Sequence, residues 1–170
     1  MAKIKPTTQA EFKAVLKFCK GKGIDIGCGT NPLNDKILTI DHYPHIHTDL
    51  VCDAKKLPFQ DARFDFVFSS HCLEDFKPDE IKNVFIEWLR IVKPGGYLVL
   101  LLPDMETVVN GKTRYPRVED PEGNPSHLVN VSPNYMKELV KDLPVEIVQQ
   151  DTIDHVKYFT FDFIVKKKEV

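Results

Sequence analysis

The sequence has few of the features that mark membrane, secreted or nucleic-acid-binding proteins. No apolar run approaches the roughly eighteen residues of a membrane-spanning helix, and residues 1–8 contain no apolar core of signal-peptide length. The formal net charge is only −2 at pH 7, which provides no basic surface for nucleic acid or an anionic membrane. We therefore expect a cytoplasmic protein that has no membrane partner and no nucleic-acid substrate.

Cysteine is also scarce, and no two cysteines have the Cys-x-x-Cys spacing of a metal or redox motif. Their mostly apolar surroundings predict free thiols rather than disulfides or a zinc site, at Cys19, Cys28, Cys52 and Cys72. Three histidines, His42, His45 and His47, are flanked by acidic residues, but their spacing matches no closed tetrahedral ligand set. We interpret them as part of a solvated loop and predict no metal.

Only eight glycines occur, and two of them, Gly27 and Gly29, follow an apolar segment that begins at Ile24. A buried strand that ends in a Gly-x-Gly turn is typical of nucleotide-binding loops, where the backbone approaches a ligand closely. The third glycine of the dinucleotide fingerprint is absent, however, and Pro32 follows instead. These residues alone are equally compatible with a strand that simply ends in a tight turn.

Carboxylates recur where predicted strands end. Asp25 precedes the glycines, Asp41 follows the apolar run 37–40, and Asp53 follows the run 50–52. Because the carboxyl ends of parallel strands meet at one edge of a sheet, Asp41 is placed to hold the two hydroxyls of a ribose. Asp53 could equally be a simple turn former.

Further motifs follow in a fixed order: Leu57-Pro58-Phe59, Phe64 to Ser69, His71 to Asp75, and Leu89 to Gly96 ahead of Tyr97 to Leu102. From about Ile24 to Pro103 this series resembles the class I S-adenosylmethionine-dependent methyltransferases, specifically the type 11 group. The resemblance implies an α/β, Rossmann-like three-layer fold with a mostly parallel sheet and an antiparallel last strand. It also implies S-adenosyl-L-methionine as the cofactor.

The resemblance assigns a cofactor-binding role to a set of residues. Gly27 and Gly29, with Cys28 between them, lie against the methionine and ribose, Asp25 orders the loop or the ammonium group, Asp41 holds the ribose, and Asp53 and Ala54 contact adenine. His42 borders the adenine pocket. Because ligands in open α/β sheets bind outside the carboxyl ends of strands, we also expect Ser69, Ser70 and His71 to border the transferable methyl group. The family more often has Glu-His where this chain has Glu74-Asp75, so the motif gives no clear catalytic assignment.

The chain departs from the usual pattern in its first crossovers. Only fourteen positions separate Gly27 from Asp41, against about twenty in a full strand–helix–strand unit, and Pro32 and Asn34 disfavour a helix there. We expect the first two crossover helices to be shortened or missing. Strands one to three would then expose apolar surface that the N-terminal helix, the segment after Pro103 or a second subunit must cover, and a homodimer is one hypothesis.

The remaining segments predict three helices and two closing strands. Helical spacing of apolar residues predicts helices over residues 8–18, from Pro78 onwards with Trp88 in the core, and from Ser132 onwards. The runs 145–148 and 157–167 are predicted to be antiparallel strands, with Phe159, Phe161 and Phe163 on one face, and residues 166–168 a solvated tail.

Residues 104–130 form the least regular segment, and we expect it to cover an acceptor site as a loop or lid. Arg114, Tyr115 and Arg117 are candidates for recognising an anionic or sugar-like acceptor, or are ordinary loop residues. His71 and His127 are the candidate catalytic bases, because a neutral imidazole can take a proton from a hydroxyl. His71 could instead cap a short helix that follows it.

Together these observations predict a single domain over residues 1–170. It would transfer a methyl group from S-adenosylmethionine to a small-molecule or sugar-like acceptor. The alternatives are an S-adenosylmethionine-binding module without turnover and another transferase that uses the same cofactor on the same fold.

Overall fold

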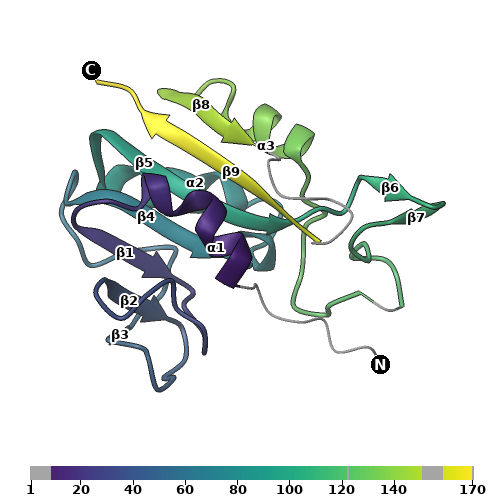
Figure 1. Ribbon diagram of the computed structural model, residues 1–170, viewed down its shortest axis with the longest axis horizontal. Coiled ribbons are helices and arrows are strands. Elements are labelled where there is room, and N and C mark those ends of the chain that lie inside the picture. The colour runs from purple at the N-terminus through teal and green to yellow at the C-terminus, as the bar shows by residue number, and fades with distance from the viewer. Residues whose placement is uncertain (1–8, 122, 151–158, 170) are drawn as a thin grey trace.

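The molecule is built on a seven-stranded sheet. In this computed structural model, residues 9–121, 123–150 and 159–169 are described. The strand order is β3-β2-β1-β4-β5-β9-β8 (Figure 1). The strands are β1 (Gly23–Ile26), β2 (Leu38–Asp41), β3 (Leu50–Val51), β4 (Phe64–Ser70), β5 (Val92–Pro103), β8 (Val145–Gln150) and β9 (Thr160–Lys167).

Strands β1 to β5 are parallel, whereas β9 runs antiparallel to both of its neighbours, β5 and β8. The last strand is therefore inserted one position inside the edge of the sheet. The predicted mostly parallel sheet with an antiparallel last strand is confirmed. Residues 157 and 158, where we placed the start of this strand, lie outside the described residues.

Helices cover the two faces of the sheet. Helices α2 (Ile81–Ile91) and α3 (Pro133–Val140) pack on one face, and α1 (Gln9–Val15), followed by the 3₁₀ turn η1 (Leu16–Phe18), packs on the other. In Figure 1, α1 crosses in front of the central strands. The predicted helices are confirmed, except that Thr8 lies outside the described residues and α2 begins at Ile81, after a turn over residues 77–80.

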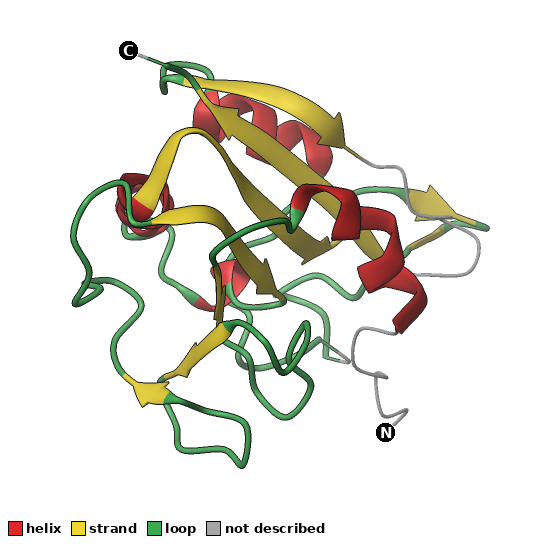
Figure 2. Cartoon of the chain, turned by 60° about the vertical axis from the view of Figure 1, so that its left-hand side comes forward, coloured by secondary structure: helices red, strands yellow, loops and turns green. Residues whose placement is uncertain are grey.

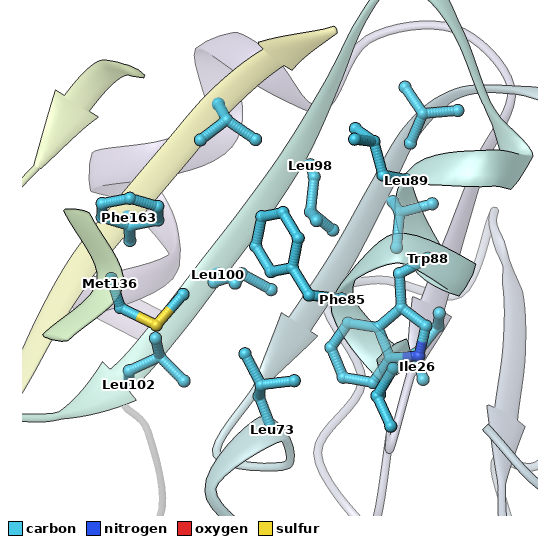
Figure 3. Close-up of a cluster of buried hydrophobic side chains, with 14 of the residues drawn as sticks. Ile26, Leu73, Phe85, Trp88, Leu89, Leu98, Leu100, Leu102, Met136 and Phe163 are labelled. Carbon is cyan, nitrogen blue, oxygen red and sulfur yellow. The ribbon is translucent and has the colours of Figure 1, made fainter. Parts of the chain in front are cut away.

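The larger core lies between the sheet and α2. Figure 3 shows Trp88 and Phe85 of α2 facing Ile26, Leu98 and Leu100 of the strands. Trp88 is fully buried, as predicted for a core residue. The phenylalanines of β4 do not share one face: a register shift lies between Phe64 and Phe66, and Phe64 packs into this core whereas Phe66 packs into the core under α1.

The first crossovers contain no helix. Residues 27–37 and 42–49 form turns and bends, and residues 52–63 add a third crossover without one (Figure 2). The shortening that the sequence predicted for the first two crossovers is confirmed. The loops are long enough to connect parallel strands only because β1, β2 and β3 are themselves short.

The face of β1 and β2 that these helices would cover is polar. Because side chains alternate along a strand, Ile24, Ile26 and Ile40 face the α2 core, while Asp25 and Thr39 face the other side. Asp25 accepts a hydrogen bond from the Leu33 backbone N–H (2.8 Å), and the Thr39 hydroxyl donates to Asp49 (2.9 Å). The loops thus cover this face of β1 and β2, and the exposed apolar surface that we expected on the first three strands is limited to Val51 of β3. The homodimer therefore loses the support of a large exposed apolar surface on these strands and stays a hypothesis.

One further expectation is corrected. Lys167 is not a solvated tail residue: its ammonium group donates to the carbonyls of Leu89 and Val92, at 2.9 and 2.8 Å, at the end of α2.

Segment 104–130 contains a short hairpin of β6 (Val108–Val109) and β7 (Lys112–Thr113), which projects from the sheet in Figure 1.

No helix within the described ranges has the length and apolar character needed to cross a bilayer. The cytoplasmic location stays a prediction.

Candidate functional site

The glycine bend after β1 is held by the acidic residue at the end of β2. Gly27 and Gly29 have φ values of +71° and +51°, in the left-handed region that favours glycine. A Cβ at Gly27 would lie 2.6 Å from the Cys72 sulfur, so a side chain there would also clash. The Gly29 N–H donates to Asp41 Oδ2 at 2.9 Å. Asp41 therefore points toward the bend, as the sequence predicted.

Two adjoining cavities lie at the carboxyl ends of the strands. The larger has a volume of about 620 Å³ and the smaller about 380 Å³. The two share lining residues, namely Gly27, Gly29, His71, Asp75 and Ser126. They therefore form one continuous hollow, with the glycine bend and His71 at the junction.

The larger cavity is lined by residues predicted to hold the nucleoside: Gly27, Gly29, Asp41, His42, Asp53 and Ala54. Asp53 also forms a turn, because its carboxylate accepts from the Lys55 backbone N–H at 2.8 Å, and its adenine-binding role stays a prediction. The Ala54 carbonyl accepts a hydrogen bond of 2.9 Å from the Trp88 indole, which links the cavity wall to the core.

Asp25 and Cys28 line the smaller cavity. The Asp25 carboxyl is almost fully buried, and burial raises its pKa to about 7, more than the Leu33 N–H lowers it. Burial also raises the pKa of the Cys28 thiol. Asp25 can thus bind or release a proton near neutrality, and a nearby cation would favour its ionised form.

Ser69 does not reach either cavity. Its buried hydroxyl donates to the Ile26 carbonyl at 2.7 Å, which joins β4 to β1, whereas Ser70 lines the smaller cavity. Of the three residues expected beside the methyl group, Ser70 and His71 line the cavity, whereas Ser69 does not. Neighbouring side chains on a strand point to opposite faces, so Ser69 and Ser70 make different contacts.

His71 and His127 meet at the smaller cavity, although 55 intervening residues separate them. His71 follows β4 with a φ of +51°, and its Nε2 lies 2.9 Å from the Thr160 hydroxyl. It does not start a regular helix, because only the 3₁₀ turn η2 (Leu73–Asp75) follows. Burial lowers the pKa of His127, so its neutral form is favoured. Both candidate bases are therefore in position to contact a ligand.

The two histidines both lie close to the carboxylate of Glu74. Its carboxylate Oε1 is 3.4 Å from His71 Nδ1 and 3.6 Å from His127 Nε2. The neighbouring Asp75 has its pKa raised to about 7, mainly by burial and then by Glu74. Sequence reasoning noted Glu74 only as part of a motif, because nothing in the local pattern shows that His127 folds back onto it.

Segment 104–130 contributes Tyr115, Asn124, Ser126 and His127 to the smaller cavity. Tyr115 packs against His127 with ring centroids 5.2 Å apart, and burial raises its pKa to about 12. Asn124 and Ser126 were not predicted, because they belong to no recognisable motif. The β6–β7 hairpin does not line either cavity.

The arginine predictions are not supported. Arg114 is buried and pairs with Asp104 at 2.8 Å, and Arg117 pairs with Glu119 on the surface. Within the described residues, the lining of the smaller cavity includes Asp25 and Asp75 but no lysine or arginine. This charge distribution does not favour an anionic acceptor.

Residues 24–100 match the family model of a methyltransferase domain, which confirms the resemblance to the type 11 group of S-adenosylmethionine-dependent methyltransferases.

Two curated relatives are similar to part of the chain. The malonyl-[acyl-carrier protein] O-methyltransferase of Marinomonas sp. is 33% identical over 112 residues, which cover 55% of this chain and 38% of that protein. The ubiquinone/menaquinone biosynthesis C-methyltransferase UbiE of Desulfotalea psychrophila is 43% identical over 51 residues, covering 30% of this chain and 20% of that protein. The aligned segments thus span well under half of either relative.

Solved structures share the fold. The 1,6-didemethyltoxoflavin-N1-methyltransferase of Burkholderia thailandensis, solved with 1,6-didemethyltoxoflavin and S-adenosylhomocysteine, has a TM-score of 0.70 at 14% identity, covering 94% of this chain and 76% of that one. At this identity the likeness concerns the fold alone, and it confirms the predicted fold class.

Proposed function

We propose that this protein binds S-adenosylmethionine across the two cavities and transfers its methyl group to a small-molecule or sugar-like acceptor. The observation that carries the proposal is the convergence of Asp41 and the glycine bend, through the Gly29 N–H, at the edge of a cavity that Asp53 and Ala54 also line. The adenosine occupies the larger cavity, with Asp41 at the ribose hydroxyls and Asp53 and Ala54 at the adenine.

The methionine end extends past the bend into the smaller cavity, where Asp25 faces the ammonium group. The acceptor lies beside it, near His71, Tyr115 and His127. A cavity of about 380 Å³ fits a small molecule, and Ser70, Tyr115 and Asn124 offer hydrogen bonds to a hydroxylated one. Removal of the acceptor's proton depends on His71 and His127, the proposed catalytic residues.

Transfer itself is an in-line displacement at an activated sulfonium. Holding the acceptor atom near the methyl carbon can supply a large part of the rate acceleration, up to about 7–11 kcal/mol in well-oriented systems. The cavity provides this positioning, and segment 104–130 acts as its cover.

Calorimetry with S-adenosylmethionine and S-adenosylhomocysteine tests the cofactor site. Asp41→Asn is expected to weaken binding about 10- to 100-fold, because hydrogen bonds to charged groups contribute about 1.5–3 kcal/mol. Asp142→Asn, an exposed carboxylate at the end of α3, is the matched control and should bind normally. No measurable affinity of the unaltered chain for either molecule would contradict the proposal.

Turnover is tested by release of S-adenosylhomocysteine with a panel of hydroxylated and amine acceptors. Cofactor binding without turnover over the whole panel would favour a binding module instead. The homodimer hypothesis is tested separately by the sedimentation mass, which should be twice that of the chain.

A further inference from the structure

We propose that His71, Glu74 and His127 form a binding site for one divalent transition metal of the zinc type. One ligand atom from each side chain lies within 4.8 Å of the others. The residues come from the end of β4, from η2 and from segment 104–130, so only the folded chain brings them together.

The separations fit coordination better than direct hydrogen bonding. Glu74 Oε1 lies 3.4 Å from His71 Nδ1 and 3.6 Å from His127 Nε2. Nitrogen–oxygen hydrogen bonds are usually about 2.7–3.2 Å long. Ligands at about 2.0–2.1 Å from a tetrahedral zinc ion stand about 3.4 Å apart, whereas an octahedral metal at that distance brings adjacent ligands to about 3.0 Å.

Glu74 supplies an independent indication of a missing cation. Its side chain is completely buried, and neither carboxylate oxygen has a hydrogen-bond partner among the described residues. An isolated buried carboxylate is costly, and buried charges are normally paired or coordinate metals. A metal ion between Glu74 and the two imidazoles would give the buried carboxylate a partner.

The surroundings of the histidines are compatible with metal binding. His71 Nε2 is 2.9 Å from the Thr160 hydroxyl, a contact that can orient the ring while Nδ1 faces Glu74. The φ of +51° at His71 is unusual for a residue other than glycine and holds the ring at the cavity. Asn124 Nδ2 lies 3.0 Å from His127 Nε2, so this amide would turn away when the metal binds.

Three protein ligands leave one tetrahedral position, and the cavity that His71 and His127 line opens onto it. This use of the site rests on the proposed methyl transfer. An acceptor hydroxyl bound at that position would lose its proton to solvent more readily. Its oxygen would then form the bond to the methyl carbon while the carbon–sulfur bond breaks and the sulfonium becomes the neutral thioether. The histidines would thus promote deprotonation through the metal.

The test is titration of the chelator-treated, dialysed full chain with Zn²⁺ alone, by calorimetry and thermal denaturation. We expect one ion per chain and a higher melting temperature. Glu74→Gln should weaken binding by on the order of 100-fold or more, since loss of even an outer-shell partner costs 10- to 100-fold. The matched control is His47→Asn, an exposed histidine outside the cluster, which should bind Zn²⁺ as the unaltered chain does.

A second readout separates ligation from a folding defect. Co²⁺ bound to the unaltered chain should give the intense visible absorption of a tetrahedral site, absent from Glu74→Gln and from His127→Asn. Without metal, Glu74→Gln should melt no lower than the unaltered chain, because the buried carboxylate oxygens have no hydrogen bonds to lose. Zn²⁺ affinity equal in Glu74→Gln and the unaltered chain, or no Zn²⁺ binding at all, would overturn the proposal. Normal binding of S-adenosylmethionine in the same sample would show that the proposed function survives that failure.

Discussion

The two halves of the sheet are stabilised in different ways. The apolar side chains of strands β4, β5 and β9 pack against α1, α2 and α3. These strands pair with one another over many residues, and few of their buried residues are polar. Strands β1 to β3 are short and are connected by loops. They rely on hydrogen bonds that Asp25 and Asp41 accept from loop backbone N–H groups and that the Thr39 hydroxyl donates to Asp49. The apolar half therefore carries the fold, and the polar half forms most of the proposed cofactor site.

The largest loss of stability is expected from a substitution in the apolar half. Trp88→Ala should lower the free energy of unfolding by about 3–5 kcal/mol, because it leaves a cavity under α2 and removes the bond to the Ala54 carbonyl. Urea denaturation measures this loss. Trp88→Phe keeps much of the packing without the indole N–H, so it should cost clearly less. Equal losses would mean that the hydrogen bond, and not packing, dominates.

The polar half should respond to pH through Asp25. Its pKa is about 7 when folded against 3.8 as the ordinary value, so the folded state binds more protons between these pH values. Without cofactor, stability should fall as the pH rises from 4 to 7, by at most about 4 kcal/mol at about 1.4 kcal/mol per pKa unit. Asp41 and the thiols of Cys19 and Cys28 are the other titratable groups that interact with it.

Denaturation at pH 5 and pH 8 checks this expectation, with Asp25→Asn as the comparison. The variant can still accept from Leu33, and its fall should be smaller by the share of Asp25, while Asp75, whose pKa is also raised to about 7, supplies the remainder. S-adenosylmethionine should also bind more tightly as the pH rises through 7, with release of a proton. Identical pH dependence in the two proteins would contradict the assignment to Asp25.

A smaller loss of stability is expected where the end of β9 meets the end of α2. Lys167→Met should cost about 1–2 kcal/mol, because the carbonyls at the end of α2 lose a charged donor. Lys168→Met changes an exposed neighbour and should be nearly neutral. Chemical denaturation of both variants gives the difference, and a Lys168 effect as large as that of Lys167 would refute a specific capping role.

The smallest loss of stability is expected from a substitution at Thr39. Thr39→Val removes the hydroxyl that donates to Asp49 and should cost about 1 kcal/mol. Cofactor affinity should fall as well, since the loop 42–49 leads from Asp41 to β3. Thr113→Val, in the separate β6–β7 hairpin, is the matched control for both stability and calorimetry. An unchanged affinity for Thr39→Val would show that this loop does not influence the site.

The sequence predicted the helices and the last strand of the apolar half well because apolar residues recur there at helical or strand spacing. It also predicted the convergence of Asp41 with the glycine bend, since strand ends of a parallel sheet share one edge. It did not predict that Asp25 and Thr39 make the uncovered face polar, because their partners lie in loops without a periodic pattern. The buried pairing of Arg114 and the approach of His127 to Glu74 depend on long-range folding, and no local spacing encodes either contact. Ser69 was expected at the cavity together with Ser70 because both stand at the end of β4, but its hydroxyl binds the Ile26 carbonyl instead.

The hydrogen bond from Trp88 to Ala54 has a consequence for evolution within this fold. The same indole fills the core with its rings and fixes a wall of the proposed nucleoside pocket with its nitrogen. Substitutions that shift α2 would therefore also move that wall, even when they lie far from any ligand. The position of the wall that would contact the nucleoside base therefore depends on how the core packs. Core packing and base recognition can change only together.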